Sequence, residues 1–126
     1  MTRIGLLRCR DNELKCPLTN CFRSMQEKIQ GFSEYHETSL VGVFTLSDDM
    51  DQAVDLARIL KAKGAEVIHM ATCAFSHKAE GKTWVLGQGF YPQADDLAAR
   101  IASEVGLPCV QGTAHLPEGY HPQVFR

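Results

Sequence analysis

The stretch "LVGVFTLSDDMDQAVDLARILKAKGAEVIHMA", from Leu40 to Ala71, decides the fold of this chain. It opens with an apolar run rich in β-branched and aromatic residues and closes with a second apolar run, which are both typical of buried strands. Between them, acidic residues crowd the first turn of a helical pattern, lysines crowd the last turn, and Gly64 occupies the position of a helix-ending glycine. The inward stripe of this helix comprises Ala53, Leu56, Ala57 and Leu60. The stretch therefore predicts a strand–helix–strand unit with parallel strands.

The same alternation continues on both sides of this unit. Residues 3–8 read as a first buried strand, and a helix is expected from Cys21 to about Gly31, with Thr19 or Asn20 as its N-cap. Residues 93–106 predict another helix, and residues 107–112 a fourth strand. We therefore expect a single domain, residues 1–126, that is a three-layer α/β/α sandwich. Its small parallel sheet should have the flavodoxin-like order 2-1-3-4.

The amino-acid composition indicates which classes of molecule this chain is expected to bind. The 126 residues include 44% hydrophobic ones and have a net charge of −2 from 13 basic and 15 acidic residues. Because no run of Lys or Arg exceeds two, we expect neither a nucleic-acid partner nor a membrane surface. The first apolar stretch is too short for a signal peptide or a membrane helix, so a cytoplasmic protein is expected. Small molecules or metal ions are the better partners.

Cysteine placement is the main functional clue. The chain has five cysteines, an odd number that in a reducing compartment favours thiols, metal ligands or redox groups over a disulfide framework. The carboxyl ends of parallel strands meet at one edge of a sheet, where ligands bind. This edge is expected to gather Cys9, Cys16, Cys21, Cys73 and His115. Cys109 lies inside the fourth predicted strand and is expected to be a buried hydrophobe. A chance cluster of unreactive thiols is the alternative.

Several of these segments resemble the CGGC domain family. They are "RIGLLRCR", "CPLTNCF", "VGVFTL", "LKAKGAEVIHMATC" and "GLPCVQGTAH", and the resemblance runs from Arg3 to about His115. It implies a small domain of uncharacterised function that binds metal, with zinc as the expected ion. On this resemblance the metal ligands would be Cys9, Cys16, Cys21, Cys73 and His115.

The chain also departs from the family pattern. The motif that names the family should follow the second strand, but "TLSDDMDQ" there has neither cysteine nor glycine. A cysteine and a histidine expected before the last helix are missing from "FYPQADD", and "GTAH" has an extra alanine before its histidine. The chain thus resembles a divergent member without about half of the presumed ligands. A non-catalytic binding or interaction module is therefore the alternative function.

The remaining residues support two kinds of chemistry. Zinc takes about four Cys or His ligands, and the four cysteines, with His115 in reserve, supply that number. An iron–sulfur cluster is less favoured, because the chain has no Cys-x2-Cys pair. Thiol redox chemistry without metal is the second reading, through a pair of Cys9 or Cys16 with Cys73. A cysteine just before a helix N-terminus has a lowered pKa, and Cys21 is expected to be placed in that way. No residue identifies a catalytic base, so enzymatic activity is left open.

The remaining candidates are weaker. His69 is expected to be a hydrogen-bonded core residue and His77 a solvent-exposed one, because His77 would join Cys73 only if that stretch were helical. The stretch from Thr72 to Pro92 has no clear period and could contain a short helix or a hairpin. It is unusually apolar around Trp84, so it either seals the core, forms a lid over the cysteine edge or makes a homodimer contact.

Overall fold

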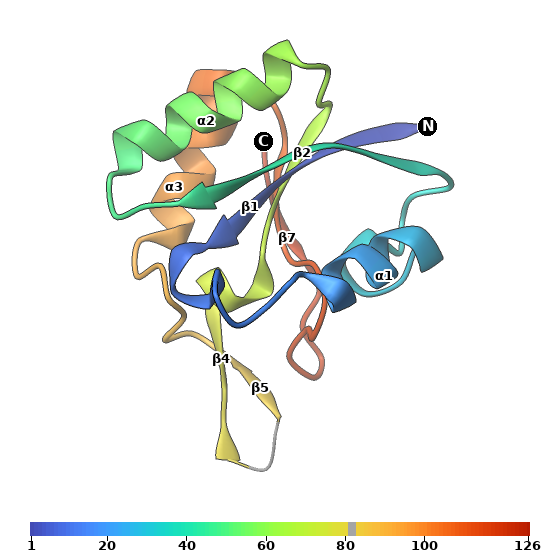
Figure 1. Ribbon diagram of the computed structural model, residues 1–126, viewed down its shortest axis with the longest axis vertical. Coiled ribbons are helices and arrows are strands. Elements are labelled where there is room, and N and C mark those ends of the chain that lie inside the picture. The colour runs from blue at the N-terminus through green and yellow to red at the C-terminus, as the bar shows by residue number, and fades with distance from the viewer. Residues whose placement is uncertain (81–82) are drawn as a thin grey trace.

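The protein is an α/β fold around a five-stranded sheet of order β2-β1-β3-β6-β7 (Figure 1), as seen in a computed structural model that describes residues 1–80 and 83–126. The strands are β1 (Thr2–Cys9), β2 (Thr38–Leu46), β3 (Val67–Met70), β6 (Cys109–Gln111) and β7 (Gln123–Phe125). The first four are mutually parallel, which confirms the predicted α/β class. The fifth, β7, was not predicted, and it pairs antiparallel with β6.

Three helices flank the sheet, with α2 and α3 on one side and α1 on the other (Figure 1). They are α1 (Thr19–Glu27), α2 (Met50–Ala62) and α3 (Ala94–Arg100), and α3 continues as a π-helical turn (Ile101–Val105). The N-cap predicted for α1 is wrong: Leu18 holds that position in a left-handed conformation, φ 66°, and its buried side chain packs with Leu6 and Cys21. Among the described helices, none is long and apolar enough to cross a membrane.

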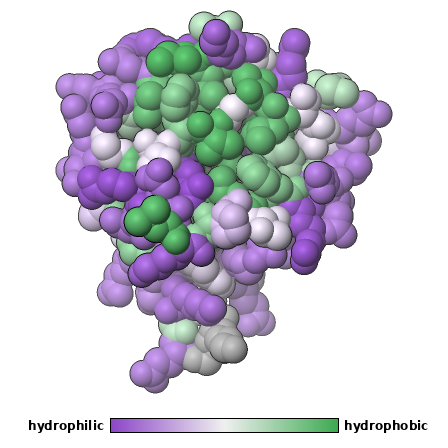
Figure 2. Space-filling view, in the orientation of Figure 1, coloured by the Kyte–Doolittle hydropathy of each residue, from purple (hydrophilic) through white to green (hydrophobic). Residues whose placement is uncertain are grey.

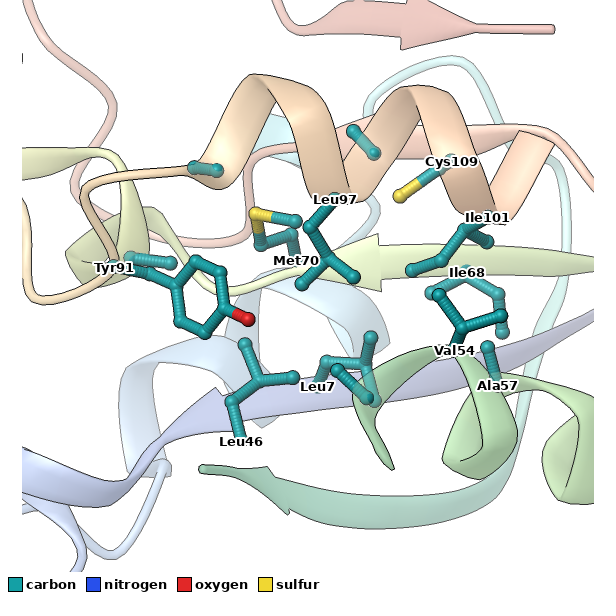
Figure 3. Packing of buried hydrophobic residues seen from close by; sticks show 14 of the residues in the cluster. Leu7, Leu46, Val54, Ala57, Ile68, Met70, Tyr91, Leu97, Ile101 and Cys109 are labelled. Atoms are coloured by element: carbon teal, nitrogen blue, oxygen red, sulfur yellow. The ribbon is translucent and has the colours of Figure 1, made fainter. Parts of the chain in front are cut away.

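Successive side chains of a strand point to opposite faces of the sheet, so buried hydrophobic residues pack on both faces. Leu7 and Ile68 point towards α2 and α3 (Figure 3), whereas Ile4 and Leu6 point towards α1. Cys109 belongs to the first group, faces the α3 side and is 0% exposed. Burial raises the pKa of its thiol to about 12. The prediction that Cys109 is a buried hydrophobe is therefore confirmed.

The stretch from Thr72 to Pro92 forms a small antiparallel hairpin of β4 (Ser76–Lys78) and β5 (Trp84–Leu86). A short 3-10 turn (Thr72–Ala74) connects β3 to it. Figure 1 shows the hairpin projecting beyond the carboxyl-terminal ends of β1 and β3. Residues 81–82 of this stretch lie outside the described residues. The hairpin, one of the two structures expected here, thus lies next to the edge where the cysteines were predicted to gather.

The edge strand β2 is apolar and only partly covered. Its sequence, "TSLVGVFTL", contains no charged residue, and Leu40 remains 38% exposed. Figure 2 shows hydrophobic residues gathered on this face of the molecule. On the other side of the sheet, β7 pairs with β6, so the backbone edge of β6 is covered.

Candidate functional site

A cavity of about 470 Å³ opens at the carboxyl-terminal ends of β1, β3 and β6. All five residues predicted to form the site line it, namely Cys9, Cys16, Cys21, Cys73 and His115. Parallel strands end together at this edge, so residues as far apart in the sequence as Cys9 and His115 share one cavity. The fold therefore brings all five predicted residues to one cavity.

Cys9 and Cys73 are the closest pair of thiols. Cys9 is the last residue of β1 and Cys73 lies in the 3-10 turn after β3. Leu7 pairs with Met70 in the parallel ladder, so both cysteines leave neighbouring strands at the same height. Their sulfur atoms are 3.0 Å apart, within hydrogen-bond distance. Cys9 is only 2% exposed, whereas Cys73 is half-buried and reaches the cavity.

Cys73 Sγ donates to Cys9 Sγ when both thiols are protonated. When the pair loses a proton, the negative charge lies on Cys73 and the remaining proton on Cys9, because the pKa of Cys73 is lowered and that of Cys9 is raised. The hydrogen bond from Cys9 is the main cause that lowers the pKa of Cys73, to about 7, with help from the Asn12 side chain and backbone amides against the effect of burial. The pKa of Cys9 is strongly raised, first by its hydrogen bond to Cys73 and then by burial. In a pair of neighbouring thiols, the one with the lower pKa is the better nucleophile, and its protonated neighbour is the resolving thiol.

The other two cysteines lie on the opposite face of the sheet. Cys21 is 9% exposed inside α1, packs with Leu6 and Leu18, and donates a hydrogen bond of 3.2 Å to Thr113 Oγ1. Burial raises the pKa of the Cys21 thiol. The predicted activation of Cys21 is therefore wrong, because α1 starts at Thr19 and encloses the thiol rather than pointing its first amides at it. Cys16 is half-buried in the loop before this helix.

His115 stands at the mouth of the cavity, where two neighbours hold it. Its Nε2 atom is 2.9 Å from Asn20 Nδ2, and its ring stacks on Trp84 with centroids 5.5 Å apart and 12° between the planes. Partial burial is the main cause that lowers its pKa, and the nearby charge of Lys78 adds to this effect. His115 is therefore a neutral ring that closes one side of the cavity at neutral pH.

The predicted ligand set does not fit a four-ligand zinc site. Within residues 1–80 and 83–126, no three His, Cys, Asp or Glu side chains come close enough to hold a metal ion. Cys21 and His115 are instead bonded to Thr113 and Asn20, and the Cys9–Cys73 pair provides two sulfurs, whereas zinc takes about four ligands. Zinc binding at these residues stays a prediction.

The two weaker histidines have different environments. His69 is 0% exposed, and its ring nitrogens lie 2.8 Å from the Gly112 carbonyl and 2.6 Å from the Tyr35 hydroxyl, which confirms the predicted core role. His77 was expected in solvent but is half-buried in β4, where Nδ1 lies 2.7 Å from the Gly87 carbonyl. The hairpin turns its side chain towards the cavity, which it helps to line.

Sequence reasoning missed two contributors to the site. Asn12 contacts the Cys73 thiol from the turn after β1, and nothing in its sequence context signals that contact. Arg8 lines the cavity, and its Nη2 atom donates to the carbonyls of Cys16, at 2.6 Å, and Asn12, at 3.3 Å. An arginine at the end of a buried apolar strand is itself a signal, because a charged group placed there needs partners.

Comparison with known proteins places the sequence of this chain in a family. The family model described as "CGGC domain" matches residues 3–114. Among curated proteins, an uncharacterised protein of Methanocaldococcus jannaschii is 26% identical over 118 residues, which is 88% of this chain and 85% of that protein. No solved structure matches the chain.

Proposed function

The chain belongs to the CGGC domain family, and we propose that its Cys73–Cys9 pair performs thiol–disulfide exchange. The observation that carries this proposal is the 3.0 Å separation of the two sulfur atoms at the wall of a cavity. Two thiols at this distance need only a small movement to form a bond of about 2.05 Å. The exposed member is also the one with the lowered pKa, as an attacking thiol requires.

The reaction runs in two balanced steps. The Cys73 thiolate attacks one sulfur of a substrate disulfide, RSSR, which forms a mixed disulfide with Cys73 and releases RS⁻. Formation of the mixed disulfide removes the Cys73 thiol, which is the largest cause of the raised pKa of Cys9. Cys9 then passes its proton to the released RS⁻ and attacks the Cys73 sulfur, which forms the Cys9–Cys73 disulfide and releases the second RS⁻. Two protein thiols are thereby oxidised and one substrate disulfide is reduced to two thiols. An external dithiol returns the protein to its starting state by the reverse exchange.

Burial assigns the two roles. Cys9 is 2% exposed, so a substrate cannot reach it before Cys73, and it acts only on the mixed disulfide beside it. Cys21 is bonded to Thr113 on the other face of the sheet, and its raised pKa makes it a poor nucleophile. The pair of Cys9 and Cys73 is therefore favoured over a pair that includes Cys16 or Cys21.

Trapping the mixed disulfide tests this function. The reduced protein is mixed with bis(2-hydroxyethyl) disulfide, quenched with acid and mapped by mass spectrometry. The Cys9→Ser variant should accumulate one 2-thioethanol adduct on Cys73, whereas the unaltered protein should proceed to the Cys9–Cys73 disulfide. The Cys16→Ser variant is the matched control and should behave like the unaltered protein.

Two results would overturn the proposal. One is an adduct of the Cys9→Ser variant on a cysteine other than Cys73, or no adduct at all. The other is stoichiometric zinc in the purified protein, released only when thiols are blocked, since a metal-held thiolate would then explain the cysteines. The interaction-module alternative corresponds to no adduct and no metal.

A further inference from the structure

The wall of the cavity is positively charged. Its lining includes three basic side chains, Arg8, Lys15 and Lys78, and it includes no aspartate or glutamate among the described residues. Asp11 and Asp48 do not line this cavity; they line an adjoining small hollow with Arg10, which shares Cys9 and Phe90 with the cavity. A chain with a net charge of −2 has thus gathered cations at the site of its most reactive thiol.

Like several other basic residues in the described part of the chain, these three cations have no acidic partner, whereas four arginines elsewhere do. Arg3, Arg10, Arg58 and Arg100 each form an ion pair with at least one carboxylate. Across residues 1–80 and 83–126, none of the three cavity cations has a carboxylate within 4.0 Å. Arg8 bonds only to backbone carbonyls, and its buried Nε atom has no hydrogen-bond partner within the described part of the chain. A partly buried guanidinium without a counter-charge favours an anion beside it.

The rest of the lining is apolar and limits the size of what fits. Leu18 and Ala71 form part of the floor, while Trp84 and Phe90 come from the hairpin region. A volume of about 470 Å³ lies in the range of small-molecule pockets. The cavity therefore combines a thiol, an apolar wall and a set of unneutralised cations.

On the basis of the proposed thiol–disulfide exchange, we propose that the substrate of Cys73 is a small disulfide that carries carboxylate groups. The carboxylates would lie near Lys15 and Lys78, and the apolar wall would contact the carbon chain. The reacting S–S bond would then face Cys73, and both released thiols would leave as anions with their carboxylates attached. The chemistry is that of the two steps given above, with the disulfide as the oxidant.

Three symmetric disulfides of similar length but different charge test whether the charge of the substrate affects its rate of reaction with the protein. They are 3,3′-dithiodipropionate, a dianion; bis(2-hydroxyethyl) disulfide, which is neutral; and cystamine, a dication. The rate of disulfide formation in the reduced protein is measured for each and divided by the rate of the same probe with free 2-mercaptoethanol. We expect the dianion to react about tenfold faster than the neutral probe and the dication to be slowest. Raising the salt concentration should reduce this difference.

Paired variants assign the effect to the cavity. The double variant Lys15→Gln, Lys78→Gln should slow the reaction of the dianion much more than that of the neutral probe, so that the two normalised rates become similar. Lys63→Gln is the matched control, because Lys63 follows α2 and comes shortly before β3, at the amino-terminal end of that strand, whereas the cavity lies at the carboxyl-terminal ends. Equal normalised rates for the three probes, or a preference for cystamine, would overturn the substrate class but leave the exchange intact. Absence of reaction with every probe would overturn the exchange itself.

Discussion

Replacing Cys9 by alanine should move the titration of Cys73 towards that of an ordinary thiol. The pKa of Cys73 is lowered from 9.0 to about 7, and the hydrogen bond from Cys9 is the largest cause. This lowering corresponds to a preference for the thiolate on the order of 3 kcal/mol. At pH 7 about half of Cys73 is thiolate at the lowered pKa and about 1% at the ordinary one. The rate of alkylation of Cys73 at pH 7 should therefore fall by up to about 50-fold.

The assay is the pH dependence of iodoacetamide labelling at Cys73, followed by mass spectrometry of the peptide that contains it. The unaltered protein should show a midpoint near 7, and Cys9→Ala a midpoint raised towards 9. Cys16→Ser provides the control, since Cys16 lines the same cavity but is not among the groups that lower the pKa of Cys73, and it should leave the midpoint in place. A midpoint near 9 in the unaltered protein, or one that Cys9→Ala leaves unchanged, would refute the reasoning.

Three further predictions concern stability. Gly31→Ala should lower the free energy of unfolding by about 1–3 kcal/mol in urea, because the new Cβ would lie 2.4 Å from the Gly112 carbonyl oxygen; an unchanged midpoint would contradict this close approach. Burial lowers the pKa of His69 to about 4, so the unfolded state binds its proton first, and stability should fall as the pH drops from about 6.5 towards 4. His69→Gln should flatten this acid loss in urea titrations, and an equally steep loss would show that other groups cause it. Tyr35→Phe should cost about 1–2 kcal/mol by removing the hydroxyl that lies 2.6 Å from His69; calorimetry that shows no loss would count against that bond.

Elements with a strong local pattern could be predicted from the sequence. Strand β2 and helix α2 have a continuous apolar run and an amphipathic stripe with Gly64 after the helix, so they were found near their observed bounds. Strand β7 escaped because its three residues, "QVF", have no period of their own and form a strand only by pairing with β6. The start of α1 was misplaced for a related reason, because burial of Leu18 outweighed the capping preference of its polar neighbours.

The location of the site could be predicted from the sequence, but which of its cysteines lie close together could not. Strand order alone carries Cys9 and Cys73 to one edge, which the sequence pattern implies. It does not reveal that Cys9 and Cys21 face opposite sides of the sheet, because that depends on the register of β1 and on where α1 packs. The contacts of Asn12 and Arg8 depend on the conformation of the turn after β1, which no sequence pattern specifies.

The most direct measurement is a redox titration of the native protein in buffers of defined thiol–disulfide ratio, with the bonds mapped by mass spectrometry at each point. We expect one reversible two-electron transition, in which only the bond between Cys9 and Cys73 forms while Cys16, Cys21 and Cys109 stay reduced. A first bond that involves Cys16 or Cys21, or thiols that remain reduced at every potential, would contradict it.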